Sequence, residues 1–102
     1  MDLTQDQWAE RIGSDPKAVI LDVRTQDEWD DGHIPNATLL DIYKPEEFLA
    51  GINSLDPDKH YYVYCKAGGR SAQACSIMSQ MGLRDCYNLL GGFTAWNGPV
   101  SK

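Results

Sequence analysis

The chain has little basic charge and lacks a long apolar run. Its 102 residues include 9 lysines and arginines against 15 aspartates and glutamates, which gives a net charge of −6. This balance argues against a nucleic-acid-binding protein and against a basic patch for a membrane surface. The uncharged stretch 71–83 is too short and too polar to span a bilayer. We therefore expect neither nucleic acid nor a membrane among the partners of this protein.

Cysteine and histidine are also scarce, and their spacing argues against several kinds of site. The three cysteines have no Cys-x-x-Cys spacing, so neither a disulfide framework nor a zinc knuckle is expected. The two histidines, His33 and His60, have no acidic or cysteine cluster nearby at ligand spacing. We expect no metal and no other cofactor. The N-terminal residues lack the basic-then-apolar order of a secretory signal, which favours a cytoplasmic protein.

Alternating strand and helix patterns predict an α/β fold. The apolar run 18–21 suits a strand buried on both faces, and the aromatic run 60–64 is the clearest strand. Weaker strands are expected at 37–40 and 86–88, with helices at 4–13, 25–30, from Pro45, at 71–81 and around Phe93 and Trp96. This order favours a mainly parallel sheet of four to five short strands with helices on both faces. We expect one domain over residues 1–102 and a monomer, since no coiled-coil seam is present.

The most informative segment follows the strand 60–64 and reads Cys65-Lys66-Ala67-Gly68-Gly69-Arg70-Ser71. A cysteine is a useful nucleophile only as the thiolate, whose formation requires a lowered thiol pKa. Backbone amides at a helix N-terminus, together with the charges of Lys66 and Arg70, supply positive potential for this purpose. Cys65 is therefore the candidate nucleophile of an enzyme. Its loop lies at the carboxyl end of a strand, where reactive loops of such folds are found.

The other residues of this segment have separate expected roles. Gly68 and Gly69 are expected to supply the backbone conformations that let a ring of amides point inward. Ser71 is expected to cap the following helix rather than act as a nucleophile, because no His or Asp is placed as its base. The remaining cysteines, Cys75 and Cys86, are expected to be small buried apolar side chains.

Together with three other segments, this loop resembles the rhodanese family of sulfurtransferases. The four segments are Leu21-Asp22-Val23-Arg24 followed by Glu28, Gly32-His33-Ile34-Pro35-Asn36-Ala37, the loop from Cys65 to Ser71, and Gly91-Gly92 with Trp96 downstream. They span residues 18–98, which implies a single-domain member with a three-layer rhodanese-like fold. The loop pattern Cys-x-x-Gly-x-Arg is similar to that of catalytically competent members.

The resemblance implies an enzyme, a thiosulfate sulfurtransferase. Cys65 would attack the outer sulfur of a small anionic donor such as thiosulfate, keep it as a persulfide, and pass it to cyanide or another thiophilic acceptor. A protein sulfur-relay partner could equally serve as donor or acceptor. The donor would be attracted by Lys66 and Arg70 and held by backbone amides. The substrate-binding loop would comprise Lys66, Ala67, Gly68, Gly69, Arg70 and Ser71.

Four residues outside the loop are expected to support it. Asp22, Arg24 and Glu28 look like the ion pairs of the family, and a charge on an otherwise apolar strand should be paired because an isolated one is costly. We expect structural support from them rather than proton transfer. Arg70 could also be held by an acidic neighbour at the start of its helix. His33 lies in a turn, where an architectural hydrogen bond is favoured over a role as general base.

Two alternative functions stay open. A phosphatase or arsenate reductase of the same fold would share the segment from Asp22 to Ala37, but its loop has five residues between cysteine and arginine. Four residues separate Cys65 from Arg70, and the tighter ring suits one sulfur better than a phosphoryl group. The other alternative is a non-catalytic binding or redox-sensing module, against which the retention of every loop element argues.

Overall fold

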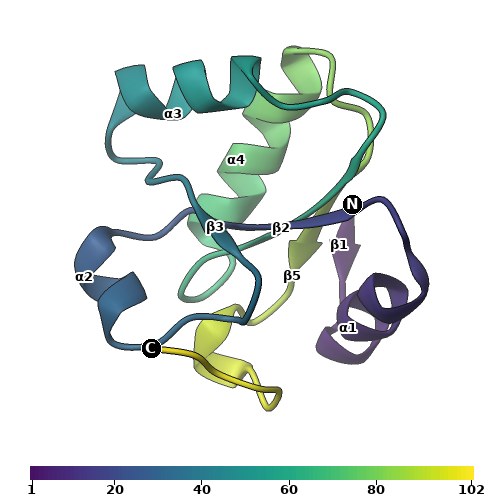
Figure 1. Cartoon of the computed structure of the whole chain (residues 1–102), viewed down its shortest axis with the longest axis vertical. Helices are drawn as coiled ribbons and strands as arrows, with labels where there is room; N and C mark the ends of the chain where they lie inside the picture. The colour runs from purple at the N-terminus through teal and green to yellow at the C-terminus, as the bar shows by residue number, and fades with distance from the viewer.

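The central feature of the computed structural model, which describes residues 1–102, is a five-stranded sheet. Its strands lie in the order β1-β5-β4-β2-β3 (Figure 1). Every pairing between neighbours is parallel, which confirms the predicted α/β architecture. The bounds of the strands are β1 Asp2–Leu3, β2 Ala18–Asp22, β3 Thr38–Leu39, β4 His60–Tyr64 and β5 Cys86–Leu89.

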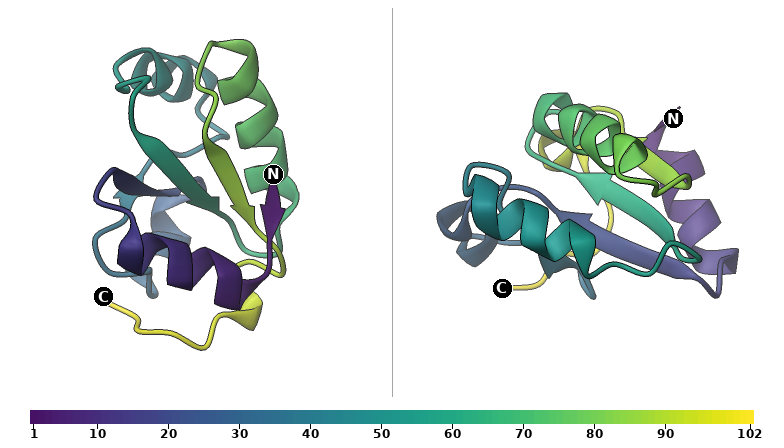
Figure 2. Two further views of the ribbon diagram at one scale, coloured as in Figure 1. Left: turned by 90° about the vertical axis from the view of Figure 1, so that its right-hand side faces the viewer. Right: turned by 90° about the horizontal axis from the view of Figure 1, so that it is seen from above.

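Helices cover both faces of this sheet, as the sequence predicts. They are α1 Gln5–Ser14, α2 Gln26–Asp30, α3 Pro45–Asn53, α4 Gly69–Gln80 and the short 3-10 segment η1 Phe93–Ala95. The helices α3 and α4 pack on one face, while α1 and η1 pack on the other (Figure 2). None of the helices has the length and apolar character needed to cross a membrane.

The strand β4 separates two apolar cores. Tyr61 and Val63 face the core beneath α3 and α4. Tyr62 and Tyr64 face the opposite core, where they pack with Trp8 of α1. Side chains of a strand alternate between its faces, and a parallel strand in the middle of a sheet is covered on both. The end of β4 is therefore held from both sides, and it is here that the chain leaves the sheet toward Cys65.

Three local features differ from the sequence predictions. The strand β1 is not predicted, because two residues are too few to show a pattern, and it forms only by pairing with β5. The helix α4 begins at Gly69 instead of residue 71, with Gly68 as its N-cap. The segment around Phe93 is a single 3-10 turn, and Trp96 follows it with extended backbone.

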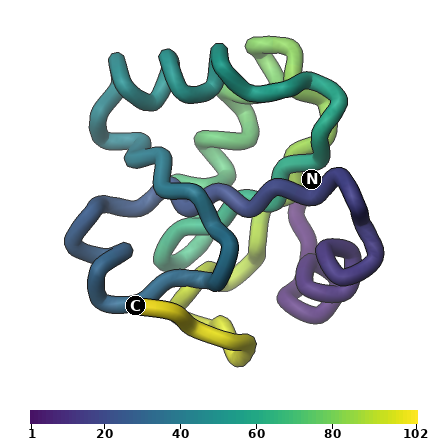
Figure 3. The backbone as a smooth tube through the Cα atoms, viewed as in Figure 1, coloured from purple at the N-terminus to yellow at the C-terminus, as the bar shows by residue number.

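The C-terminal segment returns to the turn that follows α2. His33 and Ser101 form an isolated antiparallel bridge, with backbone N···O distances of 2.9 and 2.8 Å. Figure 3 shows the final residues meeting this turn after passing beneath the sheet. The turn is thus fixed from outside by the end of the chain, and from inside by Arg24, whose guanidinium donates to the carbonyl of Gly32.

Candidate functional site

Cys65 is the first residue after β4, and the loop that it opens ends where α4 begins at Gly69. In Figure 1 this loop lies between α2 and η1, at the carboxyl ends of the central strands. Ligands of parallel α/β sheets bind at this edge. The loop that Cys65 opens therefore lies at the edge of the sheet where the sequence predicts it.

The Cys65 sulfur faces the inside of its loop. The amide of Gly68 donates to Sγ over 3.0 Å, and the hydroxyl of Ser71 lies 3.4 Å from it. Burial raises the pKa of the Cys65 thiol, but hydrogen bonds from the Ser71 hydroxyl and from the amides of Ser71, Gly68 and Ala67 outweigh burial and leave this pKa below its ordinary value. The Gly68 amide and the Ser71 hydroxyl thus face the sulfur from inside the loop.

Cys65 is more enclosed than a nucleophile in an open cleft, since only 1% of its surface is exposed. The loop residues around it, Lys66, Ala67 and Gly69, are exposed. A reagent therefore has little direct access to the sulfur. Such a site suits a small donor whose reacting atom lies at one end of the molecule.

The two glycines of the loop have different roles. Gly68 has a φ of +107°, a conformation that L-residues with a Cβ rarely adopt. Gly69 has no positive φ, and a Cβ added to it would meet nothing within 4 Å. The expectation that the ring requires both glycines holds for Gly68 and is wrong for Gly69, because Gly69 is already the first residue of a regular helix.

A second glycine turn anchors the beginning of the loop. The carbonyl oxygens of Cys65 and Lys66 accept hydrogen bonds from the amides of Phe93 and Thr94, at 2.8 and 3.0 Å. Gly92 makes this approach possible, because a Cβ there would lie 2.5 Å from the Lys66 oxygen and 2.6 Å from the Cys65 oxygen. With these carbonyls turned toward η1, the following amides are free to face the sulfur.

The guanidinium of Arg70 is held by Glu28 of α2. Two hydrogen bonds join them, from Nη1 to Oε1 at 2.7 Å and from Nη2 to Oε2 at 3.0 Å. Hydrogen bonds from Arg70 lower the pKa of Glu28 to about 2. The predicted acidic partner of Arg70 is thus Glu28, and the positive charge at this position is largely neutralised.

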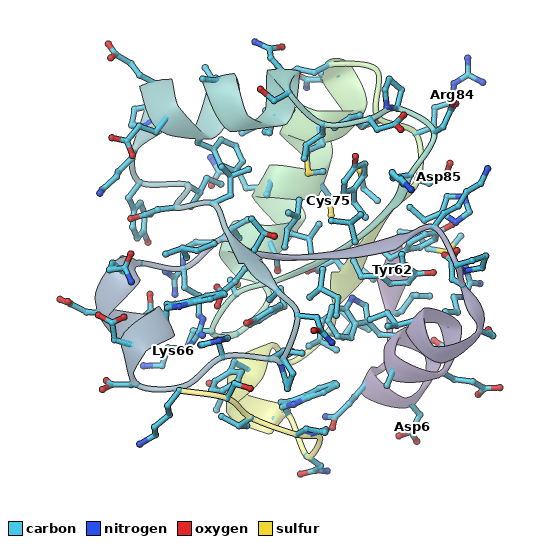
Figure 4. The ribbon with its side chains drawn as sticks, viewed as in Figure 1. Asp6, Tyr62, Lys66, Cys75, Arg84 and Asp85 are labelled. Atoms are coloured by element: carbon cyan, nitrogen blue, oxygen red, sulfur yellow. The ribbon has the colours of Figure 1, made fainter.

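Lys66 is exposed and forms no ion pair. Figure 4 shows it at the end of the molecule away from Arg84 and Asp85. Because Arg70 is paired, Lys66 is the cation of the loop whose charge stays free to act on an approaching anion.

Asp22 and Arg24 form the expected buried ion pair beneath the loop. The Arg24 Nη2 lies 2.7 Å from the Asp22 Oδ2, and the two residues are 4% and 0% exposed. The hydroxyl of Tyr64 donates to the same carboxylate at 2.7 Å and accepts from the amide of Ile34 at 3.0 Å. The pair therefore fixes the residue that precedes Cys65, which is a supporting role.

His33 makes architectural contacts. Its ring stacks on Trp29 with 3.6 Å between centroids, and its Nδ1 lies 3.1 Å from the Trp29 carbonyl oxygen. Its backbone bridges to Ser101. These contacts fit the expectation of a turn residue rather than a base.

Ser71 is not the helix cap that the sequence suggests. The helix begins two residues earlier, which places Ser71 inside its first turn, fully buried. Its hydroxyl lies within hydrogen-bond distance of Cys65 Sγ and of the Asn88 side-chain oxygen. Asn88 was missed by sequence reasoning, although an asparagine inside a short apolar strand is a usable signal, since asparagine is disfavoured in strands and a buried one needs partners.

The other two thiols lie in the apolar core, as expected. Burial raises the pKa of Cys75 to about 12 and that of Cys86 to about 11. Cys75 lies between α4 and the sheet in Figure 4. No group of three or more His, Cys, Asp or Glu side chains gathers as a metal site. Of the three sulfurs, Cys65 alone has a lowered thiol pKa.

Comparison with known proteins agrees with this geometry. The family model of the Rhodanese-like domain matches residues 4–99. The Thiosulfate sulfurtransferase GlpE of Coxiella burnetii is 36% identical over 78 residues, which cover 76% of this chain and 70% of GlpE. The Probable adenylyltransferase/sulfurtransferase MoeZ of Mycobacterium tuberculosis is 33% identical over 97 residues. That match covers 92% of this chain but 24% of MoeZ, so the chain spans about a quarter of this relative.

Solved structures give the same result. The crystal structure of a rhodanese-like domain protein from Staphylococcus aureus aligns with a TM-score of 0.85 at 30% identity, over 98% of this chain and 95% of that one. The family model covers residues 4–99, and the shared fold covers 98% of this chain. The chain belongs to the rhodanese-like domain family.

Proposed function

We propose that this protein is a sulfurtransferase that carries sulfane sulfur as a persulfide on Cys65. The observation that supports this most directly is the ring of donors around the Cys65 sulfur, which stabilises an anion at that point. A thiolate in such a ring attacks a terminal sulfur, and the same donors then face the extra sulfur of the persulfide.

The transfer has two steps. The Cys65 thiolate attacks the outer sulfur of thiosulfate, a new S–S bond forms, and the donor's own S–S bond breaks with its electron pair leaving on sulfite. A thiophilic acceptor such as cyanide then attacks the outer sulfur of the persulfide. The bond to Sγ breaks, thiocyanate leaves, and the Cys65 thiolate returns. Each step displaces a stable leaving group, which is the advantage of covalent catalysis.

The enclosure of Cys65 supports a small donor and acceptor, or a protein partner that presents a terminal persulfide. The relative MoeZ combines sulfurtransferase and adenylyltransferase in its name, and its match to this chain covers a part of its length. A relay between proteins is therefore included in the proposal. We further propose that the protein acts in the cytoplasm, where its three free thiols stay reduced.

Mass spectrometry of the intact protein tests the proposal. After incubation with thiosulfate, the wild-type chain should gain the mass of one sulfur atom, and Cys65→Ala should gain none. Cys75→Ala and Cys86→Ala are the matched controls and should gain it as the wild type does. Added sulfur on Cys75 or Cys86 would show that the nucleophile is misassigned.

Turnover distinguishes the alternative functions. Thiocyanate formation from thiosulfate and cyanide that is lost in Cys65→Ser supports sulfur transfer. Hydrolysis of an aryl phosphate that is lost in the same variant would support a phosphatase, despite the short loop. If neither activity is present in the wild type and no sulfur is acquired, the protein is a binding or redox-sensing module.

A further inference from the structure

We propose that Asn88 is a positioning residue of the site: its side-chain carbonyl competes with the Cys65 sulfur for the single hydroxyl hydrogen of Ser71. This inference rests on the proposed function for its purpose, but its geometry and its test concern the thiolate alone. The three residues form one buried cluster, with Ser71 0%, Cys65 1% and Asn88 3% exposed.

The Ser71 hydroxyl has more acceptors than it can serve. Its Oγ lies within hydrogen-bond distance of Asn88 Oδ1, 3.2 Å from the Gly68 carbonyl oxygen and 3.4 Å from Cys65 Sγ. A hydroxyl carries one hydrogen, so it donates to one of these acceptors at a time. All three acceptors are in place together, and the hydroxyl selects among them by rotation.

The Asn88 side chain is fixed with its oxygen toward Ser71. Its Nδ2 donates to the Asp2 carboxylate at 3.0 Å and faces the Gly68 carbonyl oxygen at 3.4 Å. The reverse orientation would place Oδ1 against these two acceptors with no hydrogen between them, so the network determines the orientation. The backbone of Asn88 pairs with Val63 of β4 and Asp2 of β1, which holds it from both sides.

The charge of the sulfur decides which acceptor receives the hydrogen. A thiolate is a strong acceptor, and a hydrogen bond to an ionised group is about twice as strong as one between neutral groups. A thiol or a sulfur that carries a second sulfur is a weak acceptor, so the hydroxyl then turns to the amide oxygen of Asn88. Asn88 thus stabilises the neutral states of the cluster relative to the thiolate.

The consequence is a limit on how reactive Cys65 is at rest. Without the Asn88 oxygen, only the Gly68 carbonyl oxygen, which already accepts from the Ala72 amide at 3.1 Å, would compete with the sulfur for this hydrogen, and the thiolate would be favoured further. With it, the hydrogen bond from Ser71 to the sulfur forms fully when the thiolate forms. The Ser71 hydroxyl therefore donates to the Cys65 sulfur in the thiolate that attacks the donor. It donates to Asn88 in the persulfide that stores the sulfur.

Alkylation of Cys65 by iodoacetamide between pH 6 and 9, followed site by site with peptide mass spectrometry, tests this inference. The fraction of thiolate limits the rate below the thiol pKa. Asn88→Leu should therefore increase the rate by about threefold to tenfold at the pH values of this range that lie below the thiol pKa, the effect of one neutral hydrogen bond. Ser71→Ala should decrease it.

The double variant provides the decisive control. In a Ser71→Ala background, Asn88→Leu should have no effect on the alkylation rate, because the shared hydrogen is gone. The charged groups near the cluster, Asp2 and the pair Arg70–Glu28, are the same in all variants, so their effects cancel in this comparison. Circular dichroism establishes that each variant is folded, and Asn88→Ala replaces Asn88→Leu if the latter is not.

The outcomes divide clearly. An unchanged or lower rate in the folded Asn88 variant, or an equal increase with and without Ser71, overturns the inference, since a merely structural asparagine would act independently of that hydroxyl. The outcome does not depend on sulfur transfer. A chain that fails to acquire sulfur from thiosulfate but shows the coupled rates would refute the proposed function and leave the role of Asn88 intact.

Discussion

Arg70 donates two hydrogen bonds to the Glu28 carboxylate, at 2.7 and 3.0 Å, across 42 residues of sequence. The guanidinium also lies over the ring of Tyr43, 5.3 Å from its centroid. This pair joins the first turn of α4 to α2 and closes one side of the loop that holds Cys65. The positive charge of Arg70 therefore serves mainly to fix the loop, and its attraction for an anionic donor is reduced by its partner.

The pair makes a pH-dependent contribution to stability. The pKa of Glu28 is lowered from 4.5 to about 2 in the folded protein, so the contribution is present above pH 4.5 and is lost as the pH falls toward 2. Glu28→Gln should reduce the free energy of unfolding at pH 7 by about 1–3 kcal/mol. Glutamine can still complete the capping box with Thr25, so the helix start is kept. Urea unfolding from pH 7 to pH 3 measures this.

The difference between Glu28→Gln and the wild type should stay constant from pH 7 down to about pH 4.5 and shrink between there and pH 3. A difference that stays constant with pH would mean that the carboxylate charge contributes nothing and that the variant acts through packing alone.

Lys66 should carry most of the long-range attraction for thiosulfate. Because Arg70 is paired, Lys66→Met should raise the KM for thiosulfate about threefold to tenfold at low ionic strength and much less at high salt, where exposed charges are screened. Lys17→Met is the matched control, since it removes the same charge next to the first residue of β2. That end of the strand is opposite to the carboxyl end, where the Cys65 loop lies. Equal effects of the two variants would attribute the attraction to net charge rather than to the loop.

Much of this site could be predicted because its signals are local in sequence. A cysteine at the end of an aromatic strand, a glycine and the first turn of a helix are contiguous, so Cys65 and its loop can be identified from residues 60–71 alone. The starts of the helices predicted at 4–13 and 25–30 are equally local, since each is formed by a capping box of two residues three positions apart. The strand 60–64 and both of these helices lie where the sequence predicts them.

The features that could not be predicted depend on residues far apart in sequence. Glu28 is one of 15 acidic residues, and its pairing with Arg70 follows from the placement of α2 beside α4. Asn88 meets Ser71 only because β5 lies next to β4 in the sheet. The helix start at Gly69 depends on the positive φ of Gly68, which the sequence pair Gly68-Gly69 does not assign to one glycine or the other.

The two loop glycines should therefore respond differently to the same substitution. Gly68→Ala forces an L-residue into a φ of +107°, which should cost about 1–3 kcal/mol and slow persulfide formation as the ring distorts. Gly69→Ala meets no neighbour within 4 Å and places alanine in the first turn of a helix, so stability should stay unchanged or rise by up to about 1 kcal/mol. Thermal unfolding of the two variants, side by side, checks this. Equal losses would mean that both positions require glycine.

Gly92 should be the least replaceable glycine of the site. A Cβ there would lie 2.5 Å from one backbone oxygen and 2.6 Å from another, and backbone atoms cannot move aside as a flexible side chain can. Gly92→Ala should cost about 2–4 kcal/mol and release the loop from η1. Gly13→Ala in α1, which has open space around it, is the control and should be neutral or stabilising. A stable, active Gly92→Ala protein would show that the loop does not depend on this anchor.

The three thiols should differ sharply in reactivity in the folded protein. Burial raises the pKa of Cys75 to about 12 and that of Cys86 to about 11, whereas the pKa of Cys65 is lowered by hydrogen bonds that outweigh its burial. At pH 7.5, limiting iodoacetamide should label Cys65 before either of the others, as peptide mapping would show, because the thiolate is the reacting species. In urea all three should react alike, which shows that the selectivity comes from the fold.

Because Cys65 is 1% exposed, a bulky aromatic disulfide reagent should lose more of its rate on folding than iodoacetamide does. Labelling of Cys75 or Cys86 ahead of Cys65 in the native protein would mean that the ring of amides does not activate the sulfur it surrounds.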